Sequence, residues 1–148
     1  MARVVATVEI PAEVGTVWAD VERLETHVEW MADAESIEFI TMNRKGPGTV
    51  MNVFTRVGPF STNDIIRVID WEPPYSIGVV HEGVVSGEGH FRLEPTAGGT
   101  RFVWDEELRV PWYLGGPVSA GAIAVVLRWV WRRNLGRLSA RFDDGEAQ

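Results

Sequence analysis

The chain has 148 residues, no cysteine and a formal net charge of −7 at pH 7. Because phosphate binding needs a basic face, this charge argues against a nucleic-acid partner. A chain without cysteine has no disulfide, no thiolate metal site and no thiol nucleophile. Its length is that of a single domain, residues 1–148, with one hydrophobic core.

The first part of the chain predicts a strand followed by two short helices. Residues 3–10 alternate between apolar and polar side chains, which is typical of a half-buried strand. They show no small-residue cleavage site of a signal peptide, so we expect a cytoplasmic protein. Pro11 is expected to open the first helix, and residues 26–31 are expected to form the second.

Residues 36–110 change to a pattern of strands separated by glycine- and proline-rich turns. The predicted strands are residues 36–39, 50–57, 60–71, 75–80, 84–95 and 100–110. Strand 60–71 has apolar residues at both parities, so its pattern does not decide whether Asp64 or Arg67 faces the interior. Consecutive strands with helices before and after them favour an α+β fold, in which an antiparallel sheet is covered on one face.

Residues 112–142 form the longest helical pattern of the chain. One apolar stripe recurs at steps of three and four, at Ala120, Ala124, Leu127, Trp131, Leu135, Leu138 and Phe142. A second, shorter stripe consists of Val118, Ala122, Val125 and Trp129. A helix that only covers a sheet needs one stripe. The second therefore indicates a bound ligand, a protein partner such as the other copy in a homodimer, or peripheral contact with a membrane surface. The uncharged run 112–127 is shorter than the ~20 residues that a bilayer span requires.

The order of these elements and four segments of sequence resemble the START-like superfamily, also called SRPBCC or helix-grip, and within it the polyketide cyclase/dehydrase group. The segments are IPAEVGTVWADVERL at 10–24, HVEWM at 27–31, IDWEPPYSIGV at 69–79 and GHFRLEPTAGGTRFVWDEEL at 89–108. The resemblance implies a helix-grip fold, in which a seven-stranded antiparallel curved sheet wraps around a long C-terminal helix, with two short N-terminal helices. It also implies an elongated cavity, where relatives bind lipids, sterols, polyketides, quinones or hormones. Some relatives catalyse cyclisation or dehydration, and others assist protein partners.

Glu106 is the first candidate for acid–base chemistry. In the last predicted strand, one parity consists of Arg101, Val103, Asp105, Glu107 and Arg109, and the other of Phe102, Trp104, Glu106, Leu108 and Val110. The first set is the solvent face, so Glu106 is the single charge on the apolar face, opposite Gly89 or Phe91. Desolvation there disfavours its charged form, which suits a general acid or base. A salt bridge to an arginine of the last helix, or a solvent-exposed strand end, explains Glu106 without catalysis.

His81 continues the apolar parity of Tyr75, Ile77 and Val79 and is the second acid–base candidate. The alternative is a histidine that packs in the core or at its rim. If both side chains reach the cavity, His81 and Glu106 would form an acid–base pair. The three histidines lack metal-ligand spacing, and the sequence has no glycine-rich phosphate cradle, so we expect neither a metal nor a cofactor.

We therefore expect a small hydrophobic ligand, such as a lipid, quinone or polyketide, in an internal cavity. Besides His81 and Glu106, the expected lining residues are Tyr75, Ile77, Val79, Trp104, Leu108, Val118, Ala122 and Val125, with Trp112 and Tyr113 near the entrance. Two alternatives stay open. One is a polyketide cyclase or dehydratase that uses Glu106 and His81, and the other is a module that binds a protein partner or a membrane surface.

Overall fold

The computed structural model describes residues 2–83 and 86–146. Its elements in chain order are β1 (Ala2–Ile10), α1 (Val14–Val21), η1 (Leu24–Glu29), β2 (Ala34–Phe39), β3 (Val50–Val57), β4 (Phe60–Glu72), β5 (Ser76–Glu82), β6 (Ser86–Thr96), β7 (Gly99–Arg109), η2 (Trp112–Leu114) and α2 (Gly116–Glu146), where η is a 3-10 helix. The expected α+β helix-grip fold is confirmed. The first two residues of predicted strand 84–95 lie outside the described residues.

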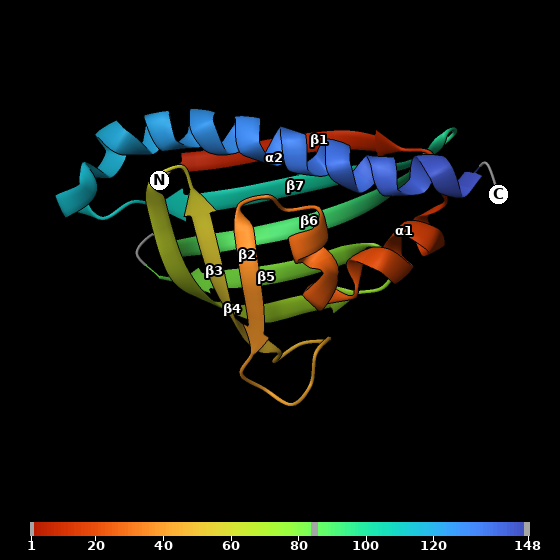
Figure 1. Ribbon diagram of the computed structural model, residues 1–148, viewed down its shortest axis with the longest axis horizontal. Helices are drawn as coiled ribbons and strands as arrows, with labels where there is room; N and C mark the ends of the chain where they lie inside the picture. Colours follow the sequence, from red (N-terminus) through yellow and green to blue (C-terminus); the bar gives the residue numbers. More distant parts are fainter. Residues whose placement is uncertain (1, 84–85, 147–148) are drawn as a thin grey trace.

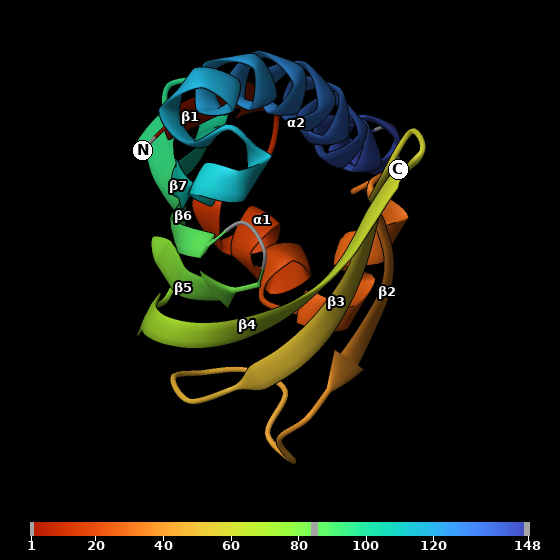
Figure 2. The ribbon, with the colours of Figure 1, turned by 90° about the vertical axis from the view of Figure 1, so that its left-hand side faces the viewer.

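The strands form one antiparallel sheet in the order β1-β7-β6-β5-β4-β3-β2. The sheet is strongly curved, and α2 runs along it (Figure 1). Figure 2, which looks along this curve, shows α2 lying across the gap between the two ends of the sheet. On its sheet side, α2 packs against β1 and β7. The curvature leaves an interior between the sheet and α2 in which a site can form.

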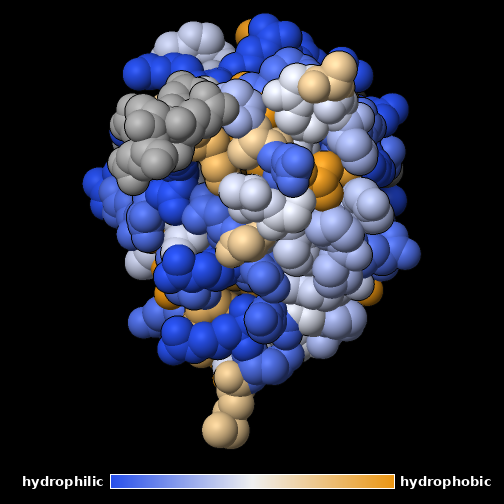
Figure 3. Space-filling model, turned by 90° about the vertical axis from the view of Figure 1, so that its right-hand side faces the viewer, coloured by the Kyte–Doolittle hydropathy of each residue, from blue (hydrophilic) through white to orange (hydrophobic). Residues whose placement is uncertain are grey.

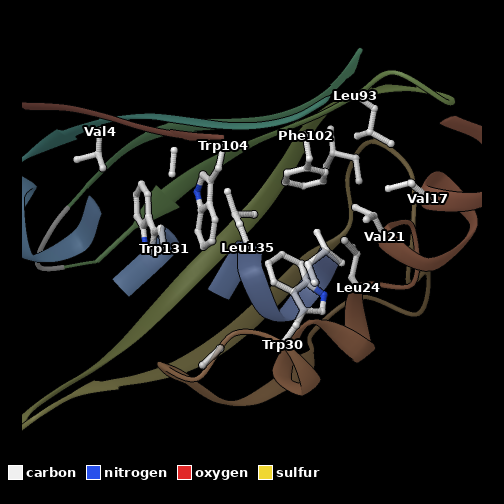
Figure 4. Close-up of a cluster of buried hydrophobic side chains, with 14 of the residues drawn as sticks. Val4, Val17, Val21, Leu24, Trp30, Leu93, Phe102, Trp104, Trp131 and Leu135 are labelled. Atoms are coloured by element: carbon white, nitrogen blue, oxygen red, sulfur yellow. The ribbon is translucent and has the colours of Figure 1, made fainter. Parts of the chain in front are cut away.

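Only one apolar stripe of α2 faces this interior. Trp131 and Leu135 are buried, and the Trp131 indole stacks on Trp104 of β7, with ring centroids 4.3 Å apart (Figure 4). The other stripe lies on the outer side, where Val118 is 88% exposed. The helix also begins later than predicted, because Gly115 adopts a left-handed φ of 101° and separates η2 from α2.

Aromatic side chains fill the interior near α1 and η1. Trp18 of α1 packs edge-on against Trp71 of β4, with ring centroids 5.4 Å apart. Trp30, directly after η1, is fully buried and contacts Phe102 and Trp104 of β7 (Figure 4). Side chains therefore fill the interior at this end of the curved sheet and form the hydrophobic core there.

Ion pairs link the helices on the outer surface at the same end of the molecule. The Arg141 guanidinium near the end of α2 lies 2.7 Å from a carboxylate oxygen of Asp20 and 2.9 Å from one of Glu29. These contacts join α2 to α1 and η1. The face of the molecule at this end is mainly hydrophilic, with scattered hydrophobic residues (Figure 3).

A β-bulge explains the ambiguous pattern of β4. Its pairing with β5 shifts register between Val68 and Asp70, so the parity of the inward residues reverses there. Asp64 and Val68 face inward before the bulge, and Trp71 packs inward after it. Ile69, at the bulge, is 44% exposed. The parities of β4 are thus mixed for two reasons, because the bulge turns Trp71 inward and because Ile69 is an apolar residue on the exposed side.

Candidate functional site

An apolar cavity of about 260 Å³ lies between the sheet and α2. Residues from η1, from strands β2 to β7 and from the inner side of α2 form its walls. Four residues predicted from strand parity line it, namely Ile77 and Val79 of β5 and Trp104 and Leu108 of β7. A mainly apolar cavity close to this size is typical of small-molecule sites.

The predicted helix residues Val118, Ala122 and Val125 do not line the cavity. Val118 and Val125 are 88% and 63% exposed, and Ala122 is also exposed. The sheet covers only one side of α2, so the stripe that packs on the sheet also supplies the cavity wall. The helix residues that line the cavity are Ile123, Leu127 and Trp131.

Three predicted aromatic residues also lie outside the cavity wall. Tyr75 is 53% exposed because it belongs to the turn before β5, where its N–H donates to the Glu72 carbonyl at 2.7 Å. The parity of β5 therefore does not extend back to it. Trp112 and Tyr113 are 87% and 63% exposed in η2, where their rings pack edge-to-face, 5.9 Å apart.

The structure brings His81 and Glu106 together in the cavity wall. Nε2 of His81 donates to Oε1 of Glu106 at 2.8 Å, and the indole N–H of Trp104 donates to the same oxygen at 3.2 Å. The His81 and Glu106 side chains are 16% and 7% exposed. This His81–Glu106 pair is thus shielded from bulk water and borders the space that a ligand would occupy.

Glycines on β6 allow this contact across two strand spacings. His81 on β5 pairs with Gly87 of β6, and Glu106 on β7 pairs with Gly89. Adjacent strands are about 4.8 Å apart, so β5 and β7 are separated by about 10 Å. A Cβ atom at Gly89 would lie 2.6 Å from Oε1 of Glu106. Glycine at this position therefore leaves the space through which the two side chains meet over the intervening strand.

Neighbouring carboxylates control the protonation of His81. Burial alone would lower the pKa of this imidazole, because a charged group is poorly solvated there. The charge and hydrogen bond of Glu106, with a contribution from Asp64, outweigh burial and raise the pKa of His81. The pair therefore favours an imidazolium that can donate a proton or a hydrogen bond.

Asp64 is a third titratable group in the wall. Its Oδ2 accepts a hydrogen bond from the Thr62 hydroxyl at 3.2 Å, and its buried Oδ1 has no partner among the described residues. Burial raises the pKa of Asp64 in spite of this hydrogen bond. Arg67, in contrast, is exposed, with its Nε 3.5 Å from a carboxylate oxygen of Glu82. Asp64, and not Arg67, is therefore the ionisable residue that β4 presents to the cavity.

The three polar groups form one cluster in a mainly apolar wall. Within the described part of the chain, Nδ1 of His81 and Oε2 of Glu106 make no hydrogen bond, and so both can contact a ligand. A protonated Asp64 carboxyl can donate a hydrogen bond to a ligand oxygen. The cluster can hold a carbonyl or hydroxyl group and can exchange protons with it.

The sequence patterns do not identify several residues in the cavity wall or directly behind it. Nδ2 of the buried Asn134 on α2 donates to Oδ1 of Asp33 at 2.6 Å, and its Oδ1 accepts from the N–H of Ala32 at 3.0 Å. Asp33 lines the cavity, and burial raises the pKa of its carboxyl. Met51 and Val53 of β3 also line the cavity, and the alternation of that strand was the available signal.

A metal site and a membrane span find no support in the described residues. In ranges 2–83 and 86–146, no three His, Asp or Glu side chains are grouped to hold a metal ion. In the same ranges, no helix combines the length and the hydrophobicity that crossing a bilayer requires. α2 has 31 residues, but its arginines from Arg128 onward make its second half polar.

Solved structures share this fold. A protein from Thermus thermophilus is 20% identical, with a TM-score of 0.75 over 95% of this chain and 96% of that one. A START superfamily protein from Mycobacterium smegmatis is 17% identical, with a TM-score of 0.77 over 97% and 99% of the two chains. An aromatase/cyclase from a Streptomyces species is 16% identical, with a TM-score of 0.75 over 95% and 93%.

The family comparison is more specific than these distant structures. A comparison with curated proteins finds no match. The family described as polyketide cyclase / dehydrase and lipid transport matches residues 1–143. Because this match spans nearly the whole chain, the protein belongs to the polyketide cyclase/dehydrase and lipid transport family.

Proposed function

We propose that the protein binds a small hydrophobic ligand in the cavity between the sheet and α2, with a carbonyl or hydroxyl oxygen of the ligand placed at the His81–Glu106 pair. The observation that carries this proposal is the combination of a mainly apolar cavity with one polar cluster in its wall. An apolar wall favours a hydrophobic body, because it removes that surface from water. The cluster supports a fixed orientation, because each buried polar group needs a partner.

A fluorescence titration with N-phenylnaphthylamine, a neutral apolar dye, tests the cavity. We expect saturable binding to the wild type and a loss of affinity of at least about tenfold in Ile123→Trp, which fills the cavity. The matched control is Val118→Trp on the outer face of the same helix, which should bind like the wild type. Equal affinity in both variants, or no binding to the wild type, would contradict the proposal.

Mass spectrometry of an organic extract identifies the natural ligand. The freshly purified protein is compared with an unrelated protein prepared in the same way. A stoichiometric lipid, quinone or polyketide would support a carrier. Its functional groups would indicate whether the His81–Glu106 pair has a reaction to catalyse.

A cyclase or dehydratase is the second candidate, supported by the 2.8 Å contact within the pair. In a dehydration, the imidazolium of His81 would give its proton to the leaving hydroxyl. The Glu106 carboxylate would take a proton from the neighbouring carbon. The C–O and C–H bonds break, a C=C bond forms, and water leaves.

Deuterium exchange separates this enzyme from a carrier. A ketone recovered from the extract is incubated with protein in deuterated water. The wild type should catalyse exchange at the carbon beside the carbonyl, and Glu106→Gln should not. Exchange at the same rate in Glu106→Gln would remove the catalytic role while leaving the binding role intact.

A further inference from the structure

A second hollow, a groove of about 400 Å³, lies between α2 and the turn from β3 to β4. Figures 1 and 2 both place this turn beside α2. Asp33 and Val57 line the groove and also line the apolar cavity, so the two spaces adjoin at these residues. The groove is therefore the neighbouring space into which a ligand longer than the cavity would extend.

Arginines give this groove a positive lining. Arg133 and Arg137 of α2 and Arg56 of β3 line it, although the whole chain has a net charge of −7. Arg56 is neutralised in part, since its Nε is 3.0 Å from a carboxylate oxygen of Glu35. Among the described residues, no carboxylate lies within 4.0 Å of Arg133 or Arg137.

The surroundings of Arg133 and Arg137 favour an external anion. The Arg133 guanidinium lies over the Trp129 ring, 4.9 Å from its centroid, and this contact orients it. Asp33 is the one carboxylate among the groove-lining residues, and it accepts a hydrogen bond from Asn134. Burial raises the pKa of Asp33, which makes protonation of this carboxylate beside an anion less costly.

We infer that the groove holds an anionic carboxylate or phosphate group of the ligand, with Arg133 and Arg137 as its partners, while the apolar body of the ligand occupies the cavity. This inference rests on the proposed function and defines the ligand class as an amphiphile with one anionic end. A guanidinium presents paired donors that match the oxygens of carboxylate and phosphate groups. No polar surface has to be buried for this contact, because the groove is open to solvent.

The test compares four ligands that share one ten-carbon chain: decanoic acid, decyl phosphate, methyl decanoate and decanol. Each displaces N-phenylnaphthylamine from the wild type, from Arg133→Gln/Arg137→Gln and from Arg132→Gln. Arg132 is an exposed arginine of the same helix that lines neither space, so its replacement is the matched control. Circular dichroism checks that all three proteins are folded.

We expect the acid, the phosphate or both to bind the wild type at least about tenfold more tightly than the ester and the alcohol. The double variant should lose this preference and bind methyl decanoate as the wild type does, within about twofold. Arg132→Gln should keep the preference. The anionic ligand with the larger gain in affinity over the ester and the alcohol identifies whether the groove prefers a carboxylate or a phosphate.

Two results overturn the inference, and they differ in meaning. If all four ligands displace the dye with equal affinity, or the preference survives in the double variant, the groove does not bind the anion and the cavity proposal stands. If the wild type does not bind the dye at all, the cavity proposal fails and this inference fails with it.

Discussion

Replacing Glu106 with glutamine tests whether its carboxylate sets the protonation of His81. The change keeps the side-chain size and an oxygen that can accept hydrogen bonds from His81 and Trp104, but it removes the charge. In the wild type, Glu106 outweighs the effect of burial and raises the pKa of His81. In Glu106→Gln burial prevails, so the pKa of His81 should fall below its ordinary value of 6.5.

The same substitution should change how stability depends on pH. In the wild type the folded-state pKa of His81 is above its unfolded value, so its stabilisation is fully present below pH 6.5 and is lost as pH rises through the folded pKa. In Glu106→Gln the contribution becomes unfavourable below pH 6.5 and vanishes above it.

Removing one partner of a buried ion pair costs about 3–5 kcal/mol when the other charge is trapped. His81 is 16% exposed and can release its proton, which lowers the expected cost. We expect a loss of about 2 kcal/mol in the free energy of unfolding at about pH 5. The loss should be less than about 1 kcal/mol once His81 is neutral in both proteins.

Urea unfolding at a series of pH values and NMR titration of the histidine ring protons measure these effects. His27 is an internal control, because it is buried, Glu106 is not among the groups that shift its pKa, and its Nε2 donates to the Val21 carbonyl at 2.7 Å. Burial lowers the pKa of His27, and Glu106→Gln should not change it. The reasoning is refuted if His81 keeps its raised pKa in the variant, or if the loss of stability is the same at every pH.

Four further substitutions separate packing, site geometry and helix propensity. Leu135→Ala should lower the free energy of unfolding by about 3 kcal/mol, because this side chain is fully buried. Leu127→Ala should lower it by only about 1 kcal/mol, because Leu127 already borders the cavity; urea unfolding compares the two. Gly89→Ala should push the Glu106 carboxyl away from His81. NMR titration should then show that the pKa of His81 is no longer raised. Gly121→Ala, at an exposed helical position with no atom within 4 Å of the added Cβ, should stabilise the protein by about 0.5–1 kcal/mol in thermal unfolding, and destabilisation there would contradict this account.

Strand parity predicted the direction of two members of the polar cluster, His81 and Glu106, because it repeats regularly along a strand. Once β5 and β7 were recognised, a single inward residue such as Ile77 or Trp104 fixed the direction of His81 and Glu106. What parity leaves open is the distance between the two side chains. That distance depends on the pairing of β6 with both strands, which places Gly89 opposite Glu106 and was one of two registers consistent with the sequence.

The same rule fails where a strand ends or bends. Tyr75 has the parity of β5 but lies in the preceding turn, so its side chain follows the turn geometry. The bulge between Val68 and Asp70 reverses parity inside β4. Asp64 precedes this bulge, and apolar spacing could not orient it because Ile65 and Ile69, at the opposite parity, are also apolar, although Ile69 is exposed.

The helix shows another limit of sequence patterns. Two apolar stripes on α2 indicated two apolar environments, but a pattern cannot tell which stripe meets the cavity and which meets solvent. The longer stripe meets both the sheet and the cavity, and Leu127 and Trp131 belong to it. The shorter stripe, with Val118, lies outside. Which stripe faces the cavity depends on how the sheet curves around α2.

Charge determines how an amphiphile would lie in the two adjoining spaces. The cavity wall contains three carboxyl groups, Asp33, Asp64 and Glu106, and the imidazolium of His81 compensates one negative charge. Burial is the main cause that raises the pKa of Asp33 and of Asp64, and the charge of Glu106 adds to it. A further anion in the cavity would meet the same poor solvation and the same charge. If the groove binds an anion as proposed, the ligand has a single favourable orientation. Its anionic end faces Arg133 and Arg137, and a neutral oxygen at its other end reaches the His81–Glu106 pair.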